Sequence, residues 1–246
     1  MSRDLDRLRV VMVGTRNPLN LGAAARAMSN FGARHLRVVN PWPAAYREAR
    51  SAMGGADVLQ RAEEHADLAD AIADCSLIVG TTSVGHRELQ HPLLDIVNGA
   101  RRIRRRLNSG KVALLFGSEK VGLSNADLSY CHWLMRIPTR DDHGSMNLGQ
   151  AVALCLYELV RNGKVRATKK TETAAVAGDV ERITELLFEA LQFSGYVKPR
   201  TSDVTREKVR RLLRRLRIDP EDTKLWLGML RQIAWKLGTD KKETTR

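Results

Sequence analysis

Small and polar residues follow two short apolar runs in the middle of the chain, residues 112–116 and 133–137. Runs of this length that end at glycine or proline are typical of buried strands. A helical pattern follows a polar turn, with one apolar face at Leu148, Val152, Cys155, Leu156 and Leu159. Two strand ends and one helix start therefore carry the residues that could bind a ligand or take part in a reaction: Gly117, Ser118, Glu119, Gly122, Pro138, Ser145 and Asn147.

These polar turns predict a ligand site at one edge of a sheet, because open α/β sheets bind ligands at the carboxyl ends of their strands. The alternative is that they are ordinary turn residues, with glycine at positive φ and serine as a helix cap. That alternative explains any one of them well. It explains less well why three polar turns would share one edge of the same sheet.

Several common motifs are absent from these turns. Gly14 and Gly22 are eight residues apart, so the loop after the first apolar run lacks the dinucleotide fingerprint. Residues 117–122 lack the Gly-Lys-Ser/Thr end of a P-loop, and Ser145 lacks the G-x-S-x-G context of a hydrolase nucleophile. Hydride transfer and nucleotide hydrolysis are therefore disfavoured, and the six scattered histidines do not indicate a zinc site.

Arg26 stands in an alanine-rich stretch, residues 23–27, whose small side chains allow close helix packing. A lone arginine on a helix is usually a solvated side chain, so the pattern alone gives a functional and an ordinary role equal weight. In the same way, Asn20 could be only a helix cap, and Glu119 could be only a surface carboxylate.

The elements that would position these residues alternate between strands and helices. Predicted strands cover residues 8–13, 36–39, 77–80, 112–116 and 133–137. Predicted helices run from residue 19 or 20 to Gly32, and over residues 44–53, 67–74, 93–107 and 148–159. This alternation predicts an α/β fold with a mainly parallel sheet and helices on both faces.

A composition break then separates the α/β part from the end of the chain. Residues 162–178 are small, polar and charged, which indicates a linker. Three helical patterns follow: residues 180–193 with Asp179 as cap, residues 205–217, and a helix from Asp219-Pro220-Glu221 to Gly238. The predicted organisation is an α/β domain over 1–162, a linker over 163–178 and a small all-α extension over 179–246.

The net charge is +13 with a sequence pI near 10.1, which favours a polyanion such as nucleic acid or anionic lipid. Residues 161–246 hold 21 basic and 12 acidic residues and so carry most of the excess. Seven basic residues share one helix of the extension, and we favour RNA contact over a merely solvated face. The expected RNA contacts there are Arg210, Arg211, Arg214 and Arg215.

The composition also indicates in which cellular compartment the protein is expected. No apolar run approaches the length of a membrane span, and no signal peptide is visible at the start of the sequence. The three widely spaced cysteines are expected to be buried thiols of a reducing compartment. We therefore expect a cytoplasmic protein.

Three segments resemble the motifs of the TrmH-type SPOUT RNA 2′-O-methyltransferases: NPLNLGAAARAMSNFG at 17–32, LLFGSEKVGLSN at 114–125 and IPTRDDHGSMNLGQAVALCLYE at 137–158. They stand in family order and at family-like spacing, and the resemblance covers residues 8–160. The stretch TSDVTREKVRRLLRRLRIDPEDTKLWLGMLRQI resembles the C-terminal extension of the TrmJ subgroup. Enzymes of that subgroup methylate the ribose of nucleotide 32 in the tRNA anticodon loop.

The resemblance implies a sheet whose last segment threads into a trefoil knot that holds S-adenosylmethionine. It also implies a homodimer in which the partner's first-motif loop completes each site, with tRNA as the substrate and no membrane. The cofactor contacts carry over onto Thr81, Thr82, Ser83, Gly117, Ile137, Gly144, Ser145 and Met146.

The implied reaction is an in-line attack of a ribose 2′-oxygen on the sulfonium methyl, with no metal. Arg26 matches the residue that acts on the hydroxyl. Because arginine stays protonated, we prefer a role in holding the adjacent phosphate and stabilising the developing alkoxide. The other members of the expected catalytic set are Asn20 and Asn147, which would position Arg26, Glu119, which would orient the loop, and Ser145.

Arg16 and Arg87 are the expected RNA contacts of the α/β domain, although Arg87 lies in a run, TTSVGHR, that is slightly longer than usual. Ser118 replaces an arginine that many relatives carry. The leading interpretation is a tRNA ribose methyltransferase. The same reaction on ribosomal RNA or at another tRNA position, a catalytically silent RNA-binding SPOUT protein and, more distantly, a phosphate-binding nucleotidase remain open.

Overall fold

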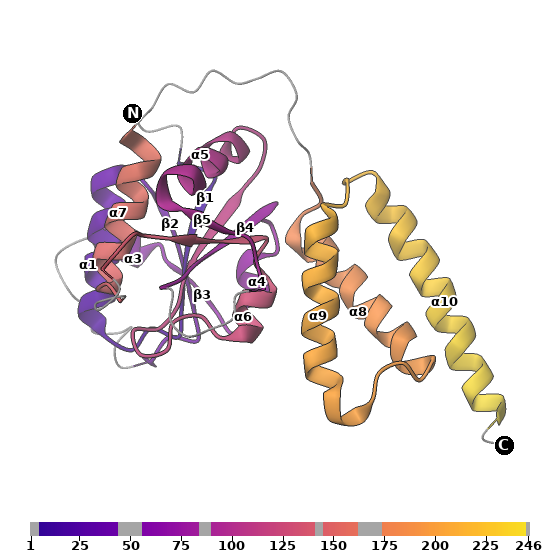
Figure 1. Ribbon diagram of the computed structural model, residues 1–246. Helices are drawn as coiled ribbons and strands as arrows, with labels where there is room; N and C mark the ends of the chain where they lie inside the picture. The colour runs from indigo at the N-terminus through magenta and orange to yellow at the C-terminus, as the bar shows by residue number, and fades with distance from the viewer. Residues whose placement is uncertain (1–4, 44–55, 84–89, 141–144, 162–173, 245–246) are drawn as a thin grey trace.

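The computed structural model describes residues 5–43, 56–83, 90–140, 145–161 and 174–244. These residues form an α/β domain (residues 5–161) and a helical extension (residues 174–244), as Figure 1 shows. The helix predicted over residues 44–53 lies outside the described residues. No helix among the described residues is both long and apolar enough to cross a membrane.

One parallel sheet forms the centre of the α/β domain. Within the described ranges it has seven strands in the order β3-β2-β1-β6-β4-β7-β5, and every pairing between neighbours is parallel. The strands are β1 (Leu8–Val13), β2 (His35–Val39), β3 (Glu63–His65), β4 (Leu77–Thr81), β5 (Leu93–Asp95), β6 (Val112–Phe116) and β7 (Trp133–Arg136).

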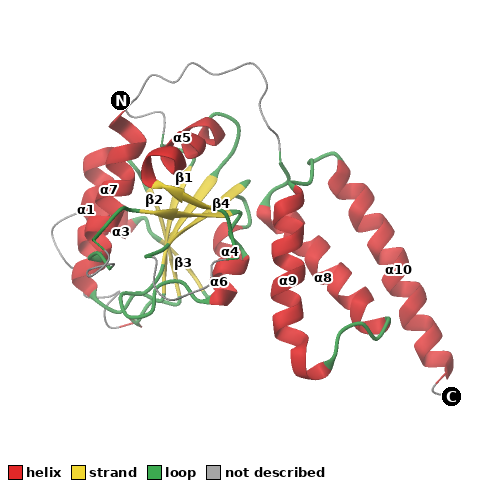
Figure 2. Ribbon diagram, viewed as in Figure 1, coloured by secondary structure: helices red, strands yellow, loops and turns green. Residues whose placement is uncertain are grey.

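Helices cover both faces of this sheet, as Figure 2 shows. The helices on one face are α1 (Pro18–Phe31), α3 (Ala56–Gln60), α5 (Ile96–Leu107) and α7 (Leu148–Arg161). The other face carries α4 (Leu68–Ile72) and α6 (Asn125–Ser129). The predicted fold class, a mainly parallel α/β sheet with helices on both faces, is confirmed. The trefoil knot stays a prediction.

Local sequence signals set the ends of α1. The side chain of Asn17 accepts a hydrogen bond from the backbone N of Leu19, and Pro18 occupies the first turn. Gly32 ends the helix in the left-handed region, at φ 76°. These signals confirm the helix predicted to end at Gly32.

The prediction of one helix over residues 93–107 is wrong at its start. Residues 93–95 form the edge strand β5, which pairs with β7, and the helix begins only at Ile96. The side chain of Asp95 caps that helix by accepting from the backbone N of Asn98 at 2.9 Å. The apolar residues Leu93 and Leu94 fit a strand as well as a helix, and pairing with β7 decides between them.

The helical extension consists of α8 (Ala177–Phe193), a short 3₁₀ turn (Pro199–Thr201), α9 (Ser202–Leu216) and α10 (Asp222–Thr244). Ile183, Leu213 and Leu230 lie at its apolar centre. The prediction that Gly238 ends the last helix is wrong, because α10 continues to Thr244. A Cβ on Gly238 would lie 3.2 Å from the ring of Phe193, so this glycine permits close packing of α10 on α8.

The first turn of α8 docks the extension onto the α/β domain. The backbone N of Ala177 donates to the carbonyl of Cys75, and that of Gly178 donates to the carbonyl of Ala73, both at 2.8 Å. These carbonyls satisfy amide groups that a capping side chain would otherwise satisfy. Val176 therefore occupies the cap position, and the prediction of Asp179 as the cap is wrong. The division into domain, linker and extension stays a prediction.

The three cysteines are free and buried, as the sequence predicts. Burial raises the pKa of Cys75 to about 12, and it raises the pKa of Cys155 to about 12 as well. Thiols of this kind behave as small apolar side chains rather than as nucleophiles.

Candidate functional site

Four neighbouring strands bring the predicted turns to one edge of the sheet. β1, β6, β4 and β7 lie side by side in that order and run in the same direction. Their carboxyl ends therefore meet where ligands bind in open α/β sheets. The predicted site residues at this edge are Arg16 after β1, Gly117 and Glu119 after β6, Thr81, Thr82 and Ser83 at the end of β4, and Ile137, Ser145, Met146 and Asn147 after β7.

A tight turn after β6 fixes the position of Glu119. The backbone N of Gly122 donates to the carbonyl of Ser118 at 2.8 Å, and Gly122 has a φ of 69°. A Cβ on Gly117 would lie 2.1 Å from the carbonyl carbon of Gly122, so the chain folds back on itself too closely for any side chain there. Glycine at position 117 is thus required by the shape of the turn.

Glu119 anchors the loop that follows β1. Its Oε2 accepts from the backbone N of Arg16 and its Oε1 from that of Asn17, both at 3.2 Å, while the side chain of Asn20 donates to Oε1 at 2.9 Å. Partial burial opposes ionisation of Glu119, but the hydrogen bonds from Asn20 and from backbone amides outweigh it and hold its pKa below the usual value. An ionised carboxylate with three donors orients the loop.

Asn147 extends this arrangement to the third motif. Its Nδ2 donates to Oδ1 of Asn20 at 2.9 Å, and its Oδ1 accepts from the backbone N of Gln150 at 3.2 Å. Asn20 is only 7% exposed. Glu119, Asn20 and Asn147 therefore form one hydrogen-bonded chain, which we call the carboxamide chain. It joins loops from three distant parts of the sequence.

Close packing of α1 on α7 holds the two asparagines opposite each other. A Cβ on Gly149 would lie 2.5 Å from the Cβ of Ala23, so these helices approach at a pair of small residues. Ala24 and Ala25 are fully buried beside this contact. The alanine-rich segment predicted to permit close helix packing does so here.

Arg26 does not join the carboxamide chain within one copy of the protein. It lies on the exposed side of α1, and it makes no hydrogen bond or ion pair with any other described residue. It lies six positions after Asn20, which turns the two side chains toward different faces of the helix. Its catalytic role stays a prediction, and no contact with the described part of its own chain positions it.

The residues predicted to hold the cofactor lie at the ends of β4, β6 and β7. The hydroxyl of Thr81 donates to the carbonyl of Leu115 at 2.8 Å, and the backbone N of Thr82 donates to the carbonyl of Met135 at 3.0 Å. These bonds tie the end of β4 to both neighbouring strands. Ile137 and Met146 are half-buried, while Ser83 and Ser145 are exposed. Gly144 lies outside the described residues.

Two of the arginines predicted to contact RNA are instead buried between helices. Arg210 is 7% exposed and donates from Nη1 to Oγ of Ser129 in α6 at 3.1 Å. Arg214 is 2% exposed and donates to Glu181 of α8 at 3.4 Å, while Arg210 donates to the same carboxylate at 2.8 Å. Both guanidinium groups lie over the ring of Tyr130, at 4.2 and 6.0 Å.

These contacts contradict the prediction that Arg210 and Arg214 face RNA. The structural reason is that α9 packs on α6 as well as on α8, so only part of its basic face is exposed. Arg215 is exposed, and Arg211 lies 3.6 Å from Glu207 one turn earlier. These two remain candidate RNA contacts. Arg87 lies outside the described residues.

Sequence reasoning missed Trp42, which is 56% exposed in the loop after β2. The guanidinium of Arg16 lies 5.9 Å from the centre of its ring. A tryptophan between two prolines, directly after a predicted strand, was the signal that could have drawn attention to it.

Comparison with known proteins places this site in a family. Residues 7–157 match the SpoU rRNA Methylase family. The tRNA (cytidine/uridine-2′-O-)-methyltransferase TrmJ of Sodalis glossinidius (strain morsitans) is 35% identical over 248 residues, which cover 98% of this chain and 95% of that relative. The crystal structure of TrmJ from Z. mobilis ZM4 superimposes with a TM-score of 0.80 at 29% identity and covers 92% of this chain and 98% of that one.

A more distant structure shares the fold alone. The SpoU methyltransferase AviRb from Streptomyces viridochromogenes in complex with the cofactor AdoMet has a TM-score of 0.52 at 22% identity, over 66% of this chain and 60% of that one. The family match covers more than half of the chain, and the Sodalis relative is matched along nearly its whole length. The chain therefore belongs to the SpoU rRNA Methylase family and, within it, to the TrmJ group.

Proposed function

We propose that the protein transfers a methyl group from S-adenosylmethionine to the ribose 2′-hydroxyl of a cytidine or uridine in tRNA, at nucleotide 32 of the anticodon loop. The carboxamide chain carries this proposal, because it joins the three family motifs at the ligand-binding edge of the sheet. The full-length match to a relative named as a tRNA methyltransferase supports tRNA as the substrate. The net charge of +13 supports a polyanion.

The ends of β4, β6 and β7 fit S-adenosylmethionine. Thr81, Gly117 and Ile137 are uncharged, and the half-buried Ile137 offers apolar surface beside backbone polar groups. Such a lining suits a purine and a ribose, and it brings no cation against the positive sulfonium. When bound, the cofactor supplies an electrophilic methyl group. Thr82, Ser83, Gly144, Ser145 and Met146 are the further contacts that we propose.

The protein's part in the reaction is alignment and charge stabilisation. The carboxamide chain holds the loop after β1 against the turn after β6, which sets the position of the RNA relative to the cofactor. Arg26 would bind the phosphate beside the reacting sugar and stabilise negative charge on the 2′-oxygen as it attacks. Because arginine stays protonated, the proton of the hydroxyl would leave to water or to that phosphate.

Arg26 requires a second copy of the chain to reach a site. Arg26 shares the exposed side of α1 with Leu19, which is 75% exposed, and the apolar surface continues on α7, which packs on α1 and exposes Leu154 by 39% and Tyr157 by 48%. Burying that surface in a two-fold dimer would bring the outer side of α1 toward the partner's site. This arrangement would account for a functional arginine that no described residue of its own chain positions. Arg16, Arg87, Arg211 and Arg215 would then contact the tRNA backbone.

A methyl-transfer assay tests the proposal. Purified protein is incubated with labelled S-adenosylmethionine and with bulk tRNA from cells that lack this enzyme, and the labelled ribose is then mapped. We expect one 2′-O-methyl group at nucleotide 32. Label in ribosomal RNA alone, or RNA binding without methyl transfer, would contradict the proposal and favour one of the alternative activities.

The variant R26A separates chemistry from cofactor binding. We expect it to abolish turnover while the affinity for S-adenosylmethionine stays near that of the wild type. Mixing R26A with a second variant damaged only in the cofactor site should restore part of the activity if Arg26 acts across the dimer. Equal loss of turnover and cofactor affinity in R26A would show that the residue is structural.

A further inference from the structure

Trp42 lies at the same edge of the sheet as the candidate site. It follows β2, which pairs in parallel with β1, so the loops after these two strands are neighbours. A single exposed apolar residue is common on folded proteins and needs no function. Trp42 differs because its 56% exposed indole lies beside Arg16, whose backbone N donates to Glu119 of the carboxamide chain.

The backbone that leads to the indole is fixed. Asn40 has a left-handed φ of 44°, and its backbone N donates to the carbonyl of His65 at 3.1 Å. Pro41 is buried, and the backbone N of Trp42 donates to the carbonyl of Thr15 at 3.1 Å. Proline at 41 and at 43 restricts φ on either side. A ligand that contacts this ring would therefore meet a preorganised surface.

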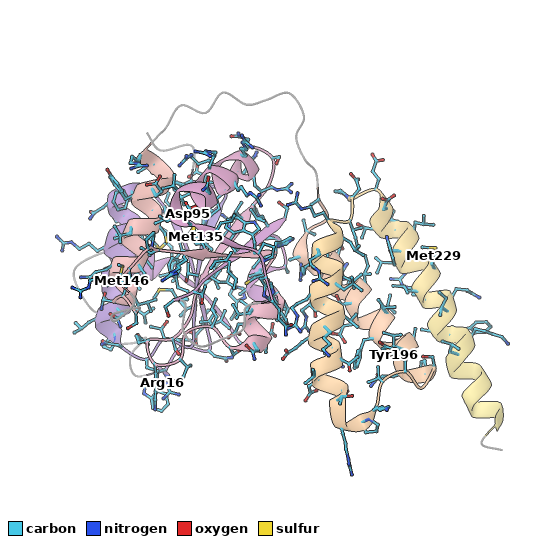
Figure 3. All side chains as sticks on the ribbon, in the orientation of Figure 1. Arg16, Asp95, Met135, Met146, Tyr196 and Met229 are labelled. Atoms are coloured by element: carbon cyan, nitrogen blue, oxygen red, sulfur yellow. The ribbon has the colours of Figure 1, made fainter. Side chains whose placement is uncertain are left out.

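Arg16 links the indole to the site. Its guanidinium lies 5.9 Å from the centre of the Trp42 ring, and its backbone N donates to Oε2 of Glu119 at 3.2 Å. One residue thus contacts both the exposed ring and the carboxylate that anchors Asn20. Figure 3 shows the side chain of Arg16 projecting outward from the loops at the lower edge of the α/β domain.

An exposed indole beside a guanidinium matches two parts of one ligand, the flat face of an unpaired nucleobase and its phosphate. Proteins recognise single-stranded RNA loops by stacking splayed bases on aromatic rings and on arginine planes. We propose that Trp42 and Arg16 form a stacking platform for an unpaired nucleobase next to the target nucleotide. This inference rests on the proposed function, in which the substrate is an RNA with an unpaired loop.

Substitutions at Trp42 test the platform through the KM for an unmodified tRNA transcript. We expect W42A to raise this KM by about 5- to 150-fold, the range for the loss of one base–aromatic stack. The effect on kcat should be smaller, and the affinity for S-adenosylmethionine should not change. W42F should recover most of the loss because its ring can still stack. W42L should resemble W42A, since leucine is apolar but has no aromatic face.

Trp235 provides a matched control, because it is a 63% exposed tryptophan on α10, in the helical extension. W235A removes the same side chain from the same protein and should leave the KM unchanged. Tryptophan emission offers a second readout. Binding of the transcript should quench the emission of the wild type, and this quenching should be lost in W42F. A fully paired RNA duplex should not produce it.

Wild-type KM values for both W42A and W42L would overturn the inference. A change in sedimentation of W42A with an unchanged KM would also overturn it, because a second copy of the chain would then cover the ring. If the wild type methylates no tRNA, the proposed function fails. Quenching by a single-stranded oligonucleotide would still decide whether Trp42 binds bases.

Discussion

The Nδ2 group of Asn147 donates a hydrogen bond to Oδ1 of Asn20 at 2.9 Å, which joins the start of α7 to the first turn of α1. The other end of the Asn20 side chain donates to Glu119, also at 2.9 Å. Asn20 therefore uses its donor and its acceptor at the same time: its amide nitrogen donates to Glu119, and its amide oxygen accepts from Asn147. Asparagine is suited to this position because one short side chain offers both groups.

The variant N20D should disrupt the site with almost no change in volume. It replaces the donor that faces Glu119 by a carboxylate oxygen, so two carboxylates would meet at hydrogen-bond distance. We expect kcat for methyl transfer to fall about 100-fold, as for a displacement of about 1 Å in a positioning group. Steady-state kinetics would measure this fall.

A matched control for N20D is N98D. The side chain of Asn98 also donates to a carboxylate, Oδ2 of Asp95 at 2.6 Å, but both residues are exposed and solvent screens them. We expect N98D to keep its kcat. A wild-type kcat in N20D as well would show that the carboxamide chain is not needed for alignment.

Local patterns predicted the elements around the site because their signals lie in neighbouring residues. The cap at Asn17, the stop at Gly32 and the apolar runs that became β1, β4, β6 and β7 needed no knowledge of distant contacts. The alternation of strands and helices then predicted the parallel sheet. A parallel sheet in turn brings the carboxyl ends of these strands to one edge. The pairing of Asn20 with Asn147 could not follow, because it depends on how closely α1 approaches α7.

The helical extension shows where such reasoning fails. Arg210 and Arg214 lie on the charged side of α9, and a one-dimensional pattern assigns such a side to solvent. In the structure α6 covers part of it and supplies Ser129, Tyr130 follows directly after α6, and α8 supplies Glu181. Nothing near α9 in the sequence indicates that these arginines would be buried by a helix whose Ser129 lies 81 positions before Arg210.

The RNA contact that we propose for α9 is thereby confined to arginines that are not buried, of which the exposed Arg215 is one. We expect R215A to weaken binding of any tRNA to a similar degree and to lower the slope of log K against log salt by about 1, as for one lost phosphate contact. Filter binding at several salt concentrations would measure the slope. An unchanged slope would exclude Arg215 from the RNA contacts.

Acid should destabilise the protein through Asp74. Burial alone would raise its pKa, but hydrogen bonds from Arg37 at 2.6 and 3.1 Å and from Lys111 at 2.8 Å hold that pKa well below its usual range. Because the folded-state pKa is lower than the unfolded value of about 3.9, this stabilisation is complete above that value. It is lost as the pH falls toward the folded-state pKa.

The variant D74N should remove that pH dependence. We expect it to lower the free energy of unfolding at pH 7 by about 2 kcal/mol, less than for a fully buried pair because Asp74 is partly exposed. Urea denaturation from about pH 7 down to about pH 2 would show a flatter acid limb for D74N below about pH 4, where the stabilisation by Asp74 is lost. E63Q is the control, since Glu63 also pairs with Arg37 but is 46% exposed. An acid limb as steep as that of the wild type would show that other carboxylates control it.

Glu181 should matter more than any other single carboxylate of the extension, because two buried arginines share it. The side chains of Arg210 and Arg214 are 8% and 1% exposed, and that of Glu181 is 17% exposed. E181Q leaves the buried guanidinium of Arg214 without that counter-charge, and it leaves Arg210 only with the exposed Glu185 at 3.9 Å. We therefore expect a loss of about 3–5 kcal/mol in the free energy of unfolding. The matched control is E185Q, one turn later, because Glu185 is 47% exposed, pairs with Arg206 and lies as far as 3.9 Å from Arg210. E185Q should cost less than about 1 kcal/mol. Urea denaturation of both variants would measure the difference, and equal stabilities would mean that stacking on Tyr130 alone is enough to hold the arginines between α6, α8 and α9.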